Sequence, residues 1–203
     1  MTQPSAAPFA IIDPRYCLPY PIDLAIVRKV LTLANGNFVV QDFNGSIIFQ
    51  VKEILLTFVH ERKLILDAAG NTIVTLRRKA LTAHSRWQVF RGESTDPKDL
   101  IFSAKTHSIL YLKTKLDVFL AHNTEEKVCD FKVKGSFFER SCVIYKGDED
   151  SATIVAQMQK KHTAQSILLG KDKFMVTVFP KMDYAFIVAL IVILDDINHE
   201  AQE

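Results

Sequence analysis

The stretch YAFIVALIVIL at residues 184–194 places eleven apolar side chains in a row. A surface helix carries a polar stripe and this one would have none, so it must be buried on every side or lie in a membrane. Eleven helical residues span about 16 Å, against about 30 Å for the hydrocarbon core of a bilayer. Asp195 and Asp196 follow directly, and carboxylates are costly in lipid. We therefore predict a buried helix at about residues 183–197, with Asp183 as its N-cap. Membrane insertion and a further strand of the sheet are the less favoured alternatives.

The sequence before this helix predicts β-strands. Short runs rich in β-branched and aromatic residues are separated by turn signals, such as Asn44-Gly45, at intervals of about 10–12 residues. The expected strand pairs occupy 37–53, 63–79, 86–92 with 100–107, 108–121 with 128–138, 141–147 with 152–162, and 166–170 with 174–179. Six hairpins give about twelve strands. A helix that is apolar all round then fits at the axis of a closed antiparallel barrel.

The first part of the chain gives weaker signals. Five of the seven prolines lie within the first 21 residues, which predicts an extended lead-in over 1–21 that stays outside the core. Residues 22–203 are expected to form a single domain. Apolar residues recur every three or four positions from Ile22 to Leu33, so we expect a short helix or turn over 22–33.

Charge is distributed unevenly along the chain. The net charge is only +2, which does not predict nucleic-acid binding, yet residues 77–115 hold nine basic and three acidic side chains, a net charge of +6. The candidate binding residues for lipid headgroups or other phosphates are Arg77, Arg78, Lys79, Arg86, Lys105, Lys113 and Lys115. Clustered cations suit a phosphate-rich partner such as a phosphoinositide headgroup. The alternative is an ordinary solvated outer face of a barrel, where lysine discourages edge pairing.

Motifs of catalysis and metal binding are absent from the sequence. There is no nucleophile elbow, phosphate-binding loop, dinucleotide-binding glycine motif or zinc-protease helix. The six histidines lack helical metal-ligand spacing, and the three cysteines form no CxxC pair. We expect a monomeric, non-enzymatic protein without a cofactor or metal. The N-terminus lacks the features of a secretory signal, so a cytoplasmic location is expected, with membrane-peripheral and nuclear locations as alternatives.

Several blocks, in order along the chain, resemble the plant LURP-one-related proteins. The blocks are YCLPYPIDLAIVRKVLTLANGNFVVQDFNGSIIFQVKE (16–53), RWQVFRG (86–92), LKTKLDVFLAHN (112–123), EEKVCDFKVKGSFFERSCVIY (125–145) and ILLGKDKFMVTVFPKMDYAFIVALIVILDDIN (167–198). The similarity covers roughly residues 11 to 198, nearly the whole chain. The family is similar to the Tubby C-terminal domain and to phospholipid scramblases. The resemblance implies a twelve-stranded antiparallel barrel around a central hydrophobic helix.

The resemblance also implies a class of function. A Tubby-like module would bind anionic membrane lipid headgroups or a protein partner, with a role in plant defence. Two alternatives are a membrane-tethered, transcription-related protein with nucleic-acid affinity and a scramblase-like protein. The near-neutral net charge weighs against nucleic acid as a partner. Scramblases carry a cysteine-rich stretch and a calcium-binding segment, and the sequence has neither.

Overall fold

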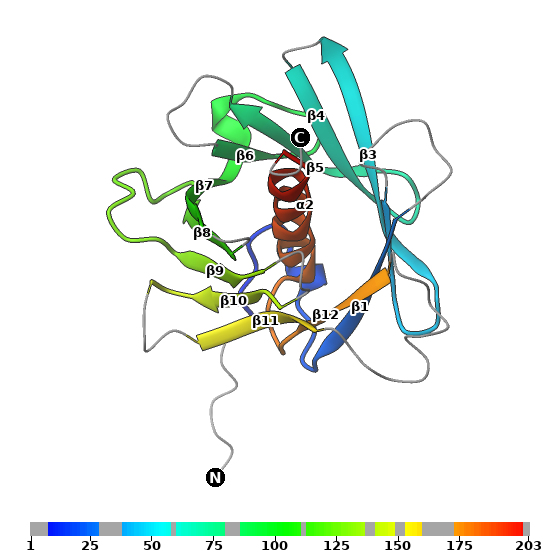
Figure 1. The fold of residues 1–203 in the computed structure, drawn as a ribbon. Coiled ribbons are helices and arrows are strands. Elements are labelled where there is room, and N and C mark those ends of the chain that lie inside the picture. Colours follow the sequence, from blue (N-terminus) through cyan, green and yellow to red (C-terminus); the bar gives the residue numbers. More distant parts are fainter. Residues whose placement is uncertain are drawn as a thin grey trace.

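The structure is a computed structural model that describes residues 8–28, 38–57, 60–79, 86–110, 113–136, 141–148, 153–159 and 173–200. In these ranges twelve strands close into a barrel around one long helix, α2 (Figure 1). The strands are β1 (Ile22–Arg28), β2 (Phe38–Gln41), β3 (Ile47–Thr57), β4 (His60–Asp67), β5 (Thr72–Lys79), β6 (Arg86–Arg91), β7 (Leu100–Leu110), β8 (Lys113–Leu120), β9 (Phe131–Gly135), β10 (Val143–Lys146), β11 (Thr153–Gln159) and β12 (Lys173–Val178). The helices are η1 (Pro14–Tyr16), η2 (Pro97–Asp99) and α2 (Tyr184–Glu200).

Each strand pairs antiparallel with its neighbours in the sequence, and β1 pairs with β12 to close the barrel. The predicted hairpin turns are confirmed, because Gly45 and Gly70 take φ of +83° and +88°, a backbone region that favours glycine. The predicted mainly-β closed barrel is therefore confirmed. One boundary differs from the expectation, since residues 108–110 extend β7 instead of starting the next strand. The strand expected at 166–170 lies outside the described residues.

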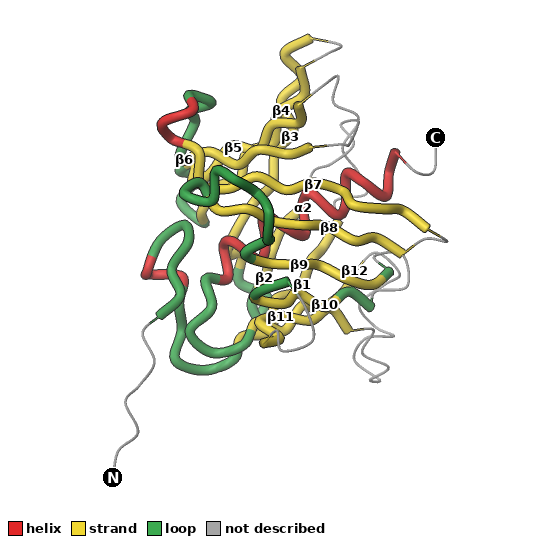
Figure 2. The backbone as a smooth tube through the Cα atoms, turned by 90° about the vertical axis from the view of Figure 1, so that its left-hand side faces the viewer, coloured by secondary structure: helices red, strands yellow, loops and turns green. Residues whose placement is uncertain are grey.

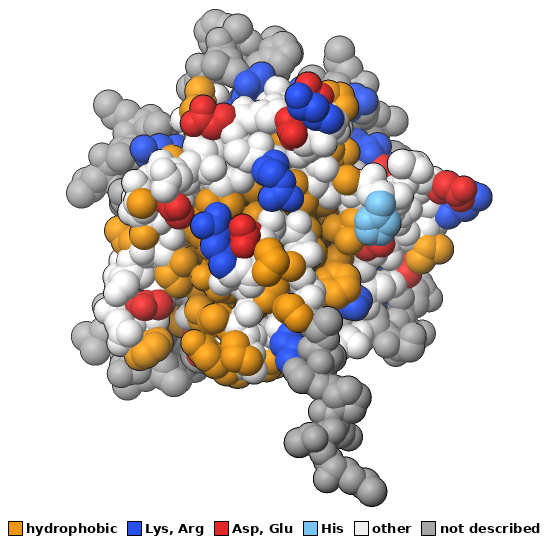
Figure 3. Space-filling model, turned by 180° about the vertical axis from the view of Figure 1, so that it is seen from behind, with side chains coloured by type: hydrophobic (Ala, Val, Ile, Leu, Met, Phe, Trp, Pro, Cys, Tyr) orange, Lys and Arg blue, Asp and Glu red, His pale blue; other side chains and the backbone are white. Residues whose placement is uncertain are grey.

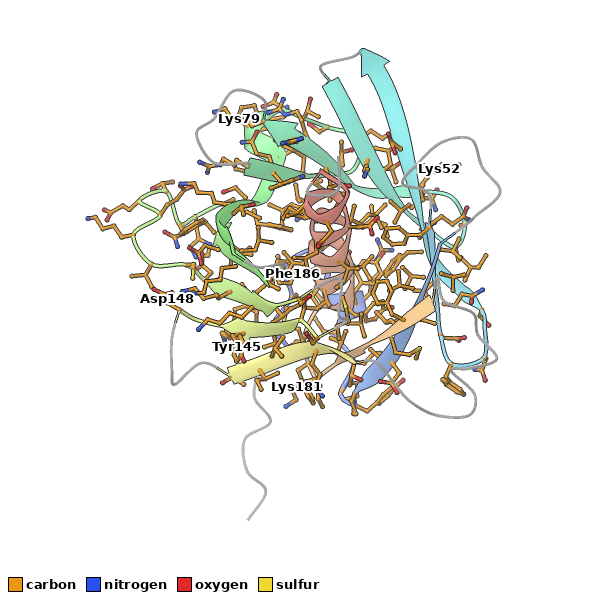
Figure 4. The ribbon with its side chains drawn as sticks, in the orientation of Figure 1. Lys52, Lys79, Tyr145, Asp148, Lys181 and Phe186 are labelled. Atoms are coloured by element: carbon orange, nitrogen blue, oxygen red, sulfur yellow. The ribbon has the colours of Figure 1, made fainter. Side chains whose placement is uncertain are left out.

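The apolar run that opens α2 fills the barrel axis, as predicted. Residues 185–194 are each at most 1% exposed. Phe186 lies inside the barrel (Figure 4). Its ring packs against one side of the barrel, with centroids 5.0 Å from Phe102 of β7 and 4.8 Å from Phe131 of β9. The two alternatives, a strand of the sheet and a membrane-inserted segment, are wrong because the barrel wall surrounds this helix on all sides. Among the described residues, no helix is both long and apolar enough to cross a bilayer.

The segment expected to be a helix or turn at 22–33 is instead strand β1 as far as Arg28, and residues 29–33 lie outside the described part. Leu24 and Ile26 are 0% and 1% exposed and face the core at period two. A spacing of four residues, as between Ile22 and Ile26, fits a helix face and a strand face equally well. Pairing with β2 and β12 decides between them, and that pairing is not visible in the local sequence.

A buried carboxylate ties the N-terminal segment to the start of α2. Asp183 is the predicted N-cap, since its Oδ1 accepts hydrogen bonds from the amides of Ala185 and Phe186. Its Oδ2 accepts three more from the amides of Ile11, Ile12 and Asp13, at 3.0, 2.6 and 3.1 Å. Residues 11–13 of the N-terminal lead-in are therefore fixed to the start of α2 at this end of the barrel.

The lead-in contributes to the core, contrary to the expectation for a proline-rich segment. Ile12 and Tyr16 are 5% and 6% exposed and belong to the main apolar cluster. Proline prevents the segment from joining a strand ladder, but it does not prevent apolar side chains from closing the end of a barrel.

Viewed from behind, the molecule mixes basic, acidic and apolar side chains over one face, without a patch of a single charge sign (Figure 3).

Candidate functional site

Cross-strand pairing places five charged side chains in one row on the outside of the barrel. Lys79 of β5 lies opposite Arg86 of β6, and Arg86 lies opposite Lys105 of β7. The row continues through Asp117 of β8 to Lys132 of β9. The residues that alternate with this row along β6 to β9 are buried in the core, so the row faces outward. Directly opposite Cβ atoms lie about 5 Å apart, so the row forms one continuous charged band.

Three further cations lie on the same outer face. Arg77 precedes Lys79 by two residues on β5, and Lys115 of β8 lies directly opposite Lys134 of β9. We call the outward-facing cations of β5 to β9 the cationic wall. Its members are Arg77, Lys79, Arg86, Lys105, Lys115, Lys132 and Lys134. Figure 2 faces β7 to β9 of this wall, and Figure 4 shows Lys79 on this side of the barrel and Lys52 on the other.

One carboxylate, that of Glu126, binds the centre of the wall. It lies in the loop 121–130 between β8 and β9, and it accepts hydrogen bonds from Arg86 Nη2 at Oε1 and from Lys105 Nζ at Oε2. Ser103 Oγ lies 3.3 Å from Oε1 and 2.9 Å from Arg86 Nη2. Burial alone would raise the pKa of Glu126, but the hydrogen bond from Lys105 and the charge of Arg86 outweigh it and lower that pKa. Glu126 is therefore a carboxylate at neutral pH.

A second ion-pair group lies at the β9 end of the row. Lys132 Nζ donates a hydrogen bond to Asp148 and lies 3.8 Å from Asp117 Oδ1. Burial would lower the pKa of Lys132, but the bond to Asp148 and the nearby charges raise it, and the same bond lowers the pKa of Asp148. Two carboxylates thus compensate Lys132. The excess positive charge of the row lies at its other end, on Lys79, Arg86 and Lys105.

The candidates from the sequence do not all share this surface. Arg77, Lys79, Arg86, Lys105 and Lys115 do. Arg78 lies on the opposite face of β5, because it is paired with the buried Trp87 and its guanidinium carbon is 5.7 Å from that ring centroid. Lys113 belongs to β8 opposite Leu110, and its side chain lies outside the described part.

Sequence reasoning missed three charged residues that shape the site: Glu126, Lys132 and Lys134. The two lysines alternate with Phe131 and Val133, so their outward direction was visible in the sequence. They were missed because they lie outside the 77–115 stretch, and only strand pairing brings β9 beside β8. The position of Glu126 over β6 and β7 depends on the path of a loop, for which the sequence holds no signal.

Other reactive groups offer little chemistry. Burial raises the pKa of the Cys129 thiol to about 12 and that of Cys17 to about 11, so both stay protonated at neutral pH and are poor nucleophiles. Within the described ranges, no three His, Cys, Asp or Glu side chains converge as they would around a metal ion. The cationic wall is therefore the surface feature with the clearest binding chemistry.

Comparison with known proteins supports the family suggested by the sequence. The family model described as LURP-one-related matches residues 22–195. Protein LURP-one-related 15 of Arabidopsis thaliana is 57% identical over 202 residues, covering 97% of this chain and 92% of that protein. Protein LURP-one-related 10 of the same plant is 56% identical over 195 residues, covering 96% of this chain and 99% of that protein.

A solved structure agrees with the fold. The X-ray structure of an Arabidopsis thaliana protein with 49% sequence identity aligns with a TM-score of 0.73 and covers 93% of this chain and 98% of that one. The names of the two relatives above specify no enzymatic activity. The family match spans all twelve strands of the barrel and most of α2, and the chain belongs to the LURP-one-related family.

Proposed function

We propose that the protein is a non-enzymatic barrel module that binds anionic phospholipid headgroups, phosphoinositides in particular, through the cationic wall. The observation that carries this proposal is the row Lys79–Arg86–Lys105, in which three cations occupy directly opposite positions on adjacent strands. Like charges directly opposite each other destabilise a sheet. A bound phosphate would relieve that repulsion and would accept hydrogen bonds from both arginine and lysine. A role in plant defence is a prediction that rests on the family resemblance alone.

Burial of the helix supports a surface function. The barrel interior holds buried apolar side chains of the described strands together with residues 185–194 of α2, and those helix residues are each at most 1% exposed. A substrate pocket at the barrel axis would need the space that these side chains fill. Ligand recognition is therefore proposed for the outer face, where the cations are.

Vesicle co-sedimentation tests the proposal. The wild-type chain is expected to bind vesicles of phosphatidylcholine with 5% phosphatidylinositol 4,5-bisphosphate at low salt, and to bind phosphatidylcholine vesicles far more weakly. A Lys79→Glu, Lys115→Glu double variant should bind the phosphoinositide vesicles about 30-fold more weakly, since each basic side chain near an anionic surface contributes about 1 kcal/mol. Both lysines are exposed, so the fold should tolerate the change.

A matched control separates the wall from bulk charge. The Lys52→Glu, Lys98→Glu double variant has the same net charge, but Lys52 lies on the far side of the barrel and Lys98 lies in η2. It should keep most of the wild-type affinity. Equal losses in both double variants would show that bulk charge drives binding, and absence of wild-type binding at low salt would refute the proposal. Binding of DNA in place of vesicles would favour the nucleic-acid alternative.

A further inference from the structure

We propose that Arg86, Ser103 and Lys105 form a phosphate subsite of the cationic wall, and that Glu126 occupies it as a built-in competitor displaced by a headgroup phosphate. This inference rests on the proposed function and adds to it a location and a form of regulation. The subsite is formed by two adjacent strands, since Arg86 is on β6 and Ser103 and Lys105 are on β7. The ligand class is a phosphomonoester on the headgroup of a membrane lipid.

The present occupant shows that the subsite binds an anion. Both oxygens of the Glu126 carboxylate are engaged, one by Arg86 Nη2 and the other by Lys105 Nζ. Ser103 Oγ is a third polar group, 3.3 Å from the carboxylate. A phosphate group can accept the same hydrogen bonds, and it brings an additional acceptor oxygen and more charge.

Arg86 keeps a donor that Glu126 does not use. Its Nε is buried and has no hydrogen-bond partner among the described residues. A buried donor without a partner is unfavourable, and a guanidinium can bind a phosphate through two parallel N–H groups. A phosphate at this position would satisfy Nε together with Nη2. The unused donor therefore favours an occupant with more acceptor oxygens than a carboxylate has.

The loop that carries Glu126 is suited to release its side chain. Glu126 has φ of +50°, a left-handed conformation that is unfavourable for residues other than glycine. Its amide donates to Asn123 Oδ1 at 3.2 Å, a bond within the loop itself. The ends of the loop are held separately, because Ala121 N donates to Ile101 O and Asp130 N to Val118 O. Glu126 can thus leave the wall while the ends of the loop remain in place.

Lys79 places a further cation beside the subsite, next to Arg86 along the wall. It lies opposite Arg86, on the side away from Lys105, and it is exposed. A headgroup with two phosphates could place one in the subsite and the second near Lys79. We therefore expect a polyphosphorylated inositol lipid to bind more tightly than a lipid with a single phosphodiester, such as phosphatidylserine.

The test uses Glu126→Gln, which keeps the size of the side chain and removes its charge. The variant is expected to bind vesicles containing 5% phosphatidylinositol 4,5-bisphosphate about tenfold more tightly than wild type, because the competitor loses its ionic contacts. Glu125→Gln is the matched control, since Glu125 is the preceding residue and its side chain is 72% exposed. It removes the same charge outside the subsite and should change the affinity less than about twofold.

A second measurement follows the loop directly. Hydrogen exchange at residues 121–130 of the wild-type chain should become faster when phosphoinositide vesicles are added, because displaced Glu126 no longer holds the loop against the wall. If wild type binds but Glu126→Gln gains no more than Glu125→Gln, or if the loop exchanges no faster on binding, the competitor role is wrong while lipid binding stands. If neither wild type nor Glu126→Gln binds at low salt, both proposals fail.

Discussion

Replacing Ile191 with Asp is expected to abolish accumulation of folded protein. Ile191 is 1% exposed and lies in the middle of the apolar run of α2, inside the closed barrel. A carboxylate there would lack both water and a partner, which costs at least about 4 kcal/mol in addition to the lost apolar packing. Domains have a total free energy of unfolding of about 5–15 kcal/mol, so little or none would remain. The measurement is the yield of soluble protein, followed by circular dichroism and thermal unfolding.

Two variants separate burial of charge from other effects. Ile191→Val removes one methylene and should cost about 1 kcal/mol, leaving a folded protein. Ile154→Asp makes the same chemical change on β11, where the side chain is 41% exposed, and it should leave the fold intact. Normal folding of Ile191→Asp would contradict an enclosed helix and would mean that this segment leaves the barrel in solution.

Replacing Asp183 with Ala should cause the second-largest loss of stability. Five backbone amides would lose their acceptor: those of Ile11, Ile12, Asp13, Ala185 and Phe186. Asp183 is 0% exposed, so water cannot readily replace it. Unpaired buried donors cost about 1–3 kcal/mol each when no relaxation occurs, and we expect about 4 kcal/mol in total. At roughly 3 °C per kcal/mol for a chain of this size, the midpoint of thermal unfolding should fall by about 12 °C.

The control for this prediction is Asp42→Ala. Asp42 also accepts two amide hydrogen bonds, from Asn44 and Ser46 at 2.9 Å each, but in an exposed turn between β2 and β3. Water can replace its oxygen, so the loss should stay below about 1 kcal/mol. Equal losses in the two variants would show that Asp183 acts as an ordinary cap and does not fix the N-terminal segment to the helix.

The sequence was most informative where a single physical constraint dominates. An apolar run without a polar stripe had to be enclosed, and tight-turn glycines such as Gly45 located the hairpins. It was least informative where two periods coincide, as from Ile22 to Ile26, since local spacing cannot reveal which strands pair. The burial of Tyr16 was likewise hidden, because proline content reports on ladder pairing and not on packing against an open barrel end.

The candidate site was also predictable in part only, from local sequence features but not from long-range contacts. Residues 77–115 carry the excess positive charge, and strand pairing brings Lys79, Arg86 and Lys105 of this stretch to directly opposite positions on adjacent antiparallel strands. The alternation rule could not show that the exposed Arg78 lies on the other face of β5 from Arg77 and Lys79, over the ring of Trp87, since the inward side of β5 depends on its neighbours. Long-range partners also remained hidden. Glu126 lies 40 residues from Arg86 in the sequence, and only the fold brings the two together.

The central claim is that the cationic wall binds the phosphates of a lipid headgroup. Its most direct test is a titration of ¹⁵N-labelled protein with inositol 1,4,5-trisphosphate, followed by amide chemical shifts at low and at physiological salt. We predict saturable shifts, weaker at higher salt, that are largest at Lys79, Arg86, Lys105 and the loop around Glu126. Shifts confined to residues outside the cationic wall and the loop 121–130, or no shifts at millimolar ligand, would contradict the claim.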